Sequence, residues 1–105
     1  MLSNVAKRYE LEDAKEKIEL QVAQASFRRQ EAEKTRDVTR ANMAKAEENL
    51  RTAGIGFREG VIPVSDVMAA QTAWLKANSE AIDAAIDVRM CDVYLSKVLG
   101  TLTLR

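Results

Sequence analysis

The chain has 105 residues, with 16 basic and 16 acidic side chains, no histidine and one cysteine, Cys91. Balanced charge argues against nucleic acid or an anionic membrane surface as a partner, because both attract a basic face. A zinc site would need carboxylate ligands alone, and an internal disulfide cannot form. The best catalytic constellation, Arg29, Arg36 and Asp92, has no nucleophile and indicates an ion pair. We therefore expect a single domain with no enzymatic activity, metal or cofactor.

The stretch from about residue 5 to residue 58 predicts one long helix. It contains no proline, and strong helix formers dominate it. Gly54 and Gly56 each cost a helix about 1 kcal/mol relative to alanine, so we expect its last turns to be its loosest part. A 4,3 spacing of mostly apolar residues has the period of a coiled-coil seam. The predicted seam positions are Ile18, Val22, Ala25, Arg29, Ala32, Arg36, Thr39, Met43, Ala46, Leu50, Ala53 and Phe57.

Residues 59–64 predict the tip of a helical hairpin. Gly60 and Pro63, the only proline, interrupt the helix-forming sequence. A glycine adopts the positive φ that ends a helix, and a proline lacks a backbone donor. Ser65 and Asp66 follow, where oxygen side chains accept hydrogen bonds from free first-turn amides and a negative charge is favoured by the helix dipole. The chain therefore reverses here and starts a new helix.

The stretch from about residue 64 to residue 99 predicts the second helix, ended by Gly100. It carries two apolar stripes on different sides. Since a two-helix hairpin buries only one of them, the other requires a further neighbour. The first stripe comprises Ala73, Ala77, Ala81, Ala84, Val88, Cys91, Leu95 and Val98. The second comprises Leu75, Ile82, Ile86 and Val93.

Together these segments predict an all-α fold: residues 1–105 form a long antiparallel two-helix hairpin of coiled-coil type. Counting back from the tip, Leu99 reaches only about as far as Ala25, so about 30 Å of the first helix overhangs the second. The overhang contains apolar residues, among them Leu11 and Leu20. We therefore expect the chain to be a fragment of a larger protein, and to self-associate in isolation because its apolar surface is uncovered.

Several short motifs follow one another along the second half of the chain. They are Ala46-Glu47-Glu48-Asn49-Leu50-Arg51, Phe57-x-x-Gly60, Ser65-Asp66-Val67-x-Ala69-Ala70-Gln71-x-x-Trp74 and Leu95-x-x-x-Leu99-Gly100-Thr101-Leu102. In this order they resemble the C-terminal repeat of the TolC-like outer-membrane efflux factors. The resemblance covers about residues 41–102, and the upstream sequence is similar to the long descending helix of the same family.

The resemblance implies one hairpin of a homotrimeric tunnel in the cell outer membrane, whose α-helical barrel crosses the periplasm. At the periplasmic end, this family meets an adaptor protein and an inner-membrane pump, for efflux or type I secretion. By the family pattern, Asp66 is the candidate acid of the lumen constriction, and Ala69 stands where a second acid is often found. The tip residues implied in adaptor docking are Phe57, Gly60, Val61, Ile62, Pro63 and Val64.

One alternative stays open, a self-contained cytoplasmic coiled-coil module that binds a partner through the tip. The chain reaches charge within its first seven residues and has no apolar core of a secretory signal, which favours this alternative. It also lacks the roughly 20 apolar residues of a membrane-spanning helix. The unpartnered end of the first helix and the pattern of glycine, acid and alanine at the tip favour the channel segment.

Overall fold

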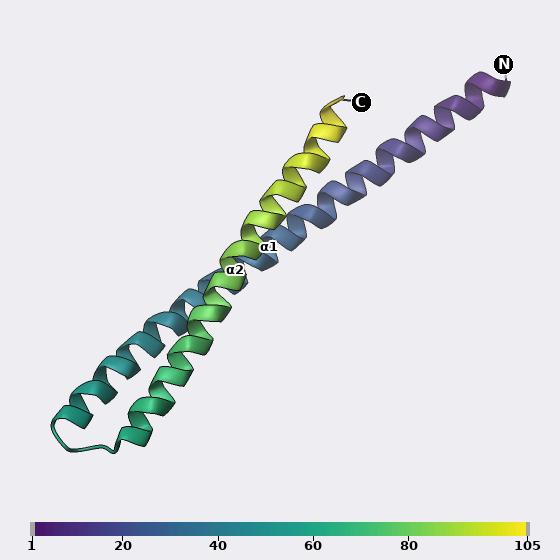
Figure 1. Ribbon diagram of the computed structural model, residues 1–105. Coiled ribbons are helices and arrows are strands. Elements are labelled where there is room, and N and C mark those ends of the chain that lie inside the picture. Colours follow the sequence, from purple (N-terminus) through teal and green to yellow (C-terminus); the bar gives the residue numbers. More distant parts are fainter. Residues whose placement is uncertain (1, 105) are drawn as a thin grey trace. The chain divides into compact units, whose positions relative to one another are not determined.

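The computed structural model describes residues 2–104, which contain two helices, α1 (Leu2–Arg58) and α2 (Val64–Leu104), and no strand (Figure 1). The predicted all-α hairpin of two helices is confirmed. In the described part of the chain, no helix is both long enough and apolar enough to cross a membrane. The structure divides into two compact units, the tip unit (Ala32–Val88) and the terminal unit (the described residues of 1–31 and 89–105).

The ends of the two helices at the tip agree with the sequence, but α2 continues past its predicted end at Gly100. In the described residues, Gly60 alone has a positive φ, so Gly100 keeps helical geometry. The hydroxyls of Thr101 and Thr103 donate to the carbonyls of Lys97 and Leu99, at 3.0 and 2.9 Å. A single glycine costs a helix only about 1 kcal/mol, so it does not end α2.

In the tip unit, α1 and α2 run antiparallel and meet along a seam. The predicted seam of α1 is confirmed there except at Phe57, which is exposed. On α2 the buried or half-buried positions that follow the seam are Val67, Ala70, Trp74, Ala77, Ala81, Ala84 and Val88, and Asn78 beside them is half-buried as well. The prediction for Ala73 is wrong, because this residue is exposed. The steps from Ala73 through Ala77 to Ala81 are both four residues, which drifts off a period of 3.5, whereas Trp74 keeps that period.

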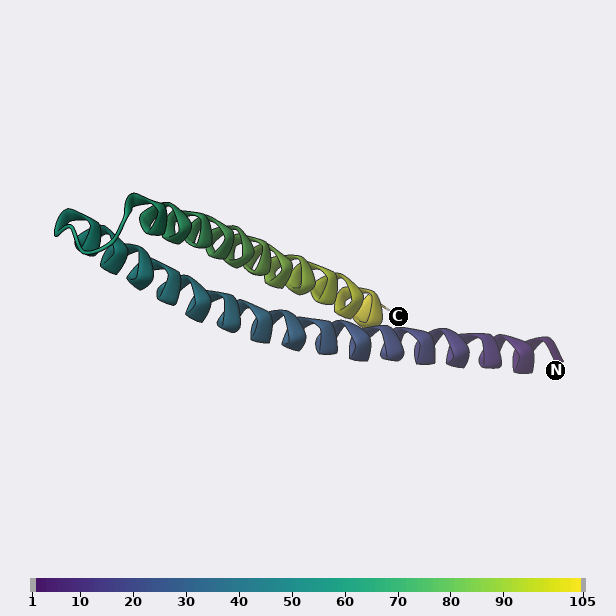
Figure 2. The same cartoon turned by 90° about the horizontal axis from the view of Figure 1, so that it is seen from below.

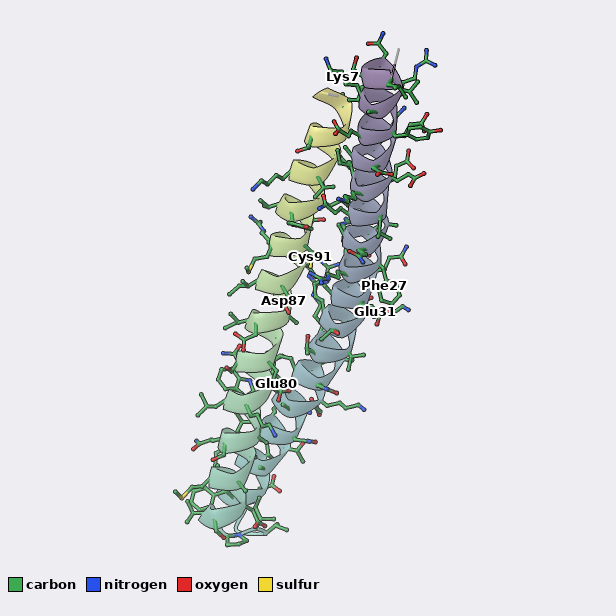
Figure 3. All side chains as sticks on the ribbon, turned by 90° about the vertical axis from the view of Figure 1, so that its right-hand side faces the viewer. Lys7, Phe27, Glu31, Glu80, Asp87 and Cys91 are labelled. Carbon is green, nitrogen blue, oxygen red and sulfur yellow. The ribbon has the colours of Figure 1, made fainter. Side chains whose placement is uncertain are left out.

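In the terminal unit, the seam continues through Ile18 and Ala25 of α1 and Val98 of α2, all buried. Cys91 is half-buried on the side of α2 that faces α1, and Phe27 projects from α1 on the opposite side (Figure 3). The N-terminal part of α1 extends beyond the end of α2 (Figure 2). The overhang predicted from the unequal helix lengths is therefore present, but it is shorter than expected, because α2 continues to Leu104 and Ile18, which the prediction left uncovered, is buried.

Candidate docking tip and packing faces

The end of α1 is a hydrogen-bonded turn centred on Gly60, whose φ is +75°. The amide of Val61 donates to the carbonyl of Gly56 at 2.8 Å, and the amide of Gly60 donates to the carbonyl of Phe57 at 3.0 Å. This pair of bonds is a Schellman motif, in which a glycine takes the left-handed conformation that other residues avoid. Carbonyls left without partners at the helix end are thereby satisfied, so the tip has a defined backbone geometry.

The apolar side chains predicted to dock at the tip fall into two groups. Val61 is 75% exposed, and Pro63, Val64 and Phe57 are also exposed. Ile62 is half-buried, because its side chain folds back over Gly56. Its Cγ1 atom would lie 3.2 Å from a Cβ placed on that glycine. The structure therefore separates one inward-facing residue from four that face solvent.

Asp66 lies in the first turn of α2 and is exposed. Its amide donates to the carbonyl of Pro63 at 3.1 Å, and α2 begins at Val64 directly after this proline. The carboxylate thus stands at the positive end of the helix dipole, where an acid is favoured. Both predicted roles of Asp66, helix-start acid and lumen acid, are compatible with this position.

In the tip unit, α2 carries apolar side chains on two opposite faces. At about 100° per residue, Leu75 lies roughly 200° around the helix from the seam residue Ala77. The face opposite the seam, named here the outer face, is formed by Val64, Met68, Leu75, Ile82 and Ile86, which are between 51% and 61% exposed. Val93 of the predicted second stripe belongs to the terminal unit and is exposed as well. The second apolar stripe predicted for this helix is therefore present, and the hairpin leaves it exposed.

Arg29 and Asp92 form an ion pair within the terminal unit, where Arg29 Nε donates to a carboxylate oxygen of Asp92. The two side chains keep 40% and 45% of their surface exposed. Arg36 lies in the tip unit, and its buried Nε has no hydrogen-bond partner among residues 2–104. The Arg36 carbonyl accepts from the hydroxyl of buried Thr39 at 2.9 Å. The predicted ion pair is thus confirmed for Arg29 and Asp92.

A second charged contact lies on the solvent side of α1. Arg51 donates through Nη2 and Nε to the two carboxylate oxygens of Glu48, at 2.6 and 3.0 Å. These hydrogen bonds, with the attraction between the charges, lower the pKa of Glu48 and raise the pKa of Arg51. In the described part of the chain, no group of three histidine, cysteine, aspartate or glutamate side chains is arranged to hold a metal ion.

Two features of the site were missed by sequence reasoning. The first is the contact between Gly56 and Ile62, which joins residues on opposite sides of the turn. The second is the position of Trp74, which lies in the seam where Ala73 was predicted. Gly60, a glycine just after the predicted helix end, is the sequence signal for the Schellman motif. It does not predict which side chain then covers Gly56.

The sequence was also compared with known proteins. The profile of the family described as outer membrane efflux protein matches residues 3–101, a range that contains the tip, Asp66 and the outer face of α2. No curated protein and no solved structure gives a significant match. Because the family match spans nearly the whole chain, this chain belongs to the outer membrane efflux protein family.

Proposed function

We propose that this chain is one hairpin of the periplasmic α-helical barrel of a homotrimeric outer-membrane channel. The channel would serve a tripartite efflux system or a type I secretion system and export small molecules or proteins. Membership of the outer membrane efflux protein family implies a component of an outer-membrane efflux channel. The place in the barrel, the trimer, and the adaptor and pump partners are the parts that we propose.

The observation that supports this proposal best is the distribution of apolar side chains on α2. Larger side chains such as Leu75 and Ile82 lie on the exposed outer face, while alanines such as Ala77 and Ala84 are buried in the seam. Burying one large aliphatic side chain contributes about 1.5–3 kcal/mol. In a barrel wall each helix has a neighbour on both sides, so a second helix would bury the outer face.

The terminal unit supports the same proposal. In its part of α1, the overhang included, large exposed apolar side chains share one face, and Leu11 is exposed as well. Adjacent hairpins of a barrel would cover that face as well. The exposed residues concerned are Leu2, Tyr9, Leu20 and Phe27.

We further propose that the tip docks onto a periplasmic adaptor protein, which links the channel to an inner-membrane pump. Val61 and Val64 expose aliphatic surface on a turn held by the hydrogen bonds of Gly60. Exposed apolar side chains on a rigid turn are suited to contact with another helical hairpin.

Asp66 is the proposed lumen acid. Three copies around a threefold axis would place three carboxylates together, and such a ring favours cations and binds divalent ions. In the complete channel that contains this chain, Asp66→Asn should weaken cation selectivity and divalent block in single-channel conductance. If both stay unchanged while stability falls by about 1 kcal/mol, Asp66 acts only at the start of α2.

The proposed function is tested in the complete channel by charging the outer face. Leu75→Lys combined with Ile82→Lys should abolish trimer assembly and drug efflux, because the neighbouring helix would then bury two unpaired charges. Asp87→Lys serves as the control, since Asp87 is an exposed acid between the two apolar faces of α2. Normal assembly and efflux of the double variant would refute the barrel position. Recovery of the unmodified chain as a separate stable cytoplasmic protein would support the self-contained module instead.

A further inference from the structure

We propose that Gly56 is a positioning residue for the docking tip. The Ile62 side chain packs on the bare α-carbon of Gly56, a contact named here the seat, and this packing presents Val61 to the adaptor. This inference rests on the docking role proposed above. It assigns a function to a glycine inside α1 that helix formation alone does not require.

Two independent contacts converge on Gly56. Its carbonyl accepts hydrogen bonds from the amides of Val61 and Ile62, at 2.8 and 3.4 Å. Its α-carbon faces the Ile62 side chain, whose Cγ1, Cδ1 and Cγ2 atoms would lie 3.2, 3.4 and 3.7 Å from an added Cβ. A contact of 3.2 Å is closer than ordinary carbon packing. An alanine at this position would therefore require the Ile62 side chain to move by a few tenths of an ångström from its place against α1.

Gly54 provides the matched comparison, because it occupies the same helix two residues earlier. A Cβ on Gly54 would meet nothing within 4 Å. Its carbonyl accepts from Arg58 Nε at 3.4 Å, which alanine would preserve. Both glycines carry the same intrinsic penalty for a helix. If they served only to loosen the end of α1, replacing either one would have the same effect.

The exposed fractions of Val61 and Ile62 link the packing of Ile62 on Gly56 to docking. Ile62 is half-buried, whereas Val61, which precedes it, is 75% exposed. The connection between the helices is only residues 59–63, so moving Ile62 also moves the peptide that carries Val61. The seat therefore determines the direction in which Val61 faces an aliphatic surface on the adaptor's helical hairpin.

The first experiment uses the complete 105-residue chain and compares Gly56→Ala with Gly54→Ala by amide hydrogen exchange. In Gly56→Ala, exchange at the amides of Val61 and Ile62 should accelerate by about tenfold, because local opening becomes easier. In Gly54→Ala it should stay within about twofold of the original chain. Equal exchange in the two variants overturns the proposal.

The second experiment measures docking in the complete channel with a Ser65→Cys variant cross-linked to the adaptor, since Ser65 is exposed beside the tip and Val61 is kept. Adding Gly56→Ala should lower the cross-linking yield by about tenfold while trimer assembly persists, and adding Gly54→Ala should leave it unchanged. Combining Gly56→Ala with Ile62→Ala removes the clash, so it should lower the yield no further than Ile62→Ala does.

The two experiments separate failure of this inference from failure of the docking role. If the channel without glycine replacements cross-links and the two glycine variants behave alike, Gly56 has no positioning role. If that channel never cross-links through the cysteine at position 65, the docking function itself is refuted, together with the presentation of Val61. The hydrogen-exchange result depends on neither the adaptor nor the pump.

Discussion

The two apolar faces of α2 in the tip unit differ in the size of their side chains. The smaller side chains are buried in the seam and the larger ones are exposed on the outer face, the reverse of what an independent hairpin would show. Ala77 and Ala84 in the seam are 8% and 4% exposed, whereas Leu75 and Ile82 on the outer face are 60% and 51% exposed. A hairpin that folded only for itself would bury its larger side chains. Alanines allow α1 and α2 to approach closely, while the larger side chains remain available for another helix. Residue size on α2 thus separates the face that is buried within the hairpin from the face that we propose packs against a neighbour.

The largest expected effect comes from placing the same charge on each face. Ala84→Asp should destabilise the tip unit by several kcal/mol, because the carboxylate would be buried without a partner. Ile86→Asp should change stability by no more than about 0.5 kcal/mol, since Ile86 is already exposed. Urea denaturation of the 105-residue chain, followed by circular dichroism at low protein concentration, measures both. Equal losses would show that the outer face packs within the chain.

The next effect concerns association of the isolated chain. If copies pack through the outer face, Leu75→Gln combined with Ile82→Gln should weaken self-association by at least about tenfold, because burial of each side chain contributes about 1.5–3 kcal/mol. Sedimentation equilibrium measures the dissociation constant. Lys76→Gln is the control, since it changes the polar side of α2. A folded monomer of the original chain at high micromolar concentration would contradict this prediction.

The seam was predictable because its period follows from helix geometry alone. Of the positions predicted on α1, Phe57 is the single exposed one in the described chain. The period fails at the tip, where α1 ends and α2 no longer covers it. On α2 the choice between Ala73 and Trp74 was ambiguous, since alanines occur on several sides of that helix. A residue that is apolar but small does not identify a buried face.

The roles of the glycines were less predictable, because they depend on contacts across the turn. Gly60 fits a local rule, the positive φ at a helix end. Gly100 matches the same rule but remains inside α2. Gly56 is distinguished by the Ile62 side chain above it, which no local pattern specifies. The proposed docking and lumen residues were chosen through the family motifs, and they remain predictions.

A smaller effect is expected at the charged contact in the terminal unit. Asp92→Asn should destabilise the chain by at most about 1 kcal/mol, because the ion pair with Arg29 is partly exposed to solvent. Thermal denaturation at low salt and at about 1 M salt separates this attraction from packing, since salt screens exposed charges. Asp87→Asn is the control, because Asp87 is an exposed acid of the tip unit. A loss that is the same at both salt concentrations would assign the effect to packing.

The smallest effect tests whether the solvent side of α1 differs from the outer face of α2. Glu48 and Arg51 pair there with 60% and 63% of their side-chain surface exposed. Because Arg51 lowers the pKa of Glu48 in the folded chain, the contribution of the pair is complete above the unfolded pKa of Glu48. It is lost as pH falls through the lower, folded pKa. In a pH titration followed by NMR, Arg51→Gln should return the pKa of Glu48 to its ordinary value, whereas Arg58→Gln should leave it lowered. If the pKa of Glu48 stayed the same in Arg51→Gln, the ion pair between Glu48 and Arg51 would not form in solution.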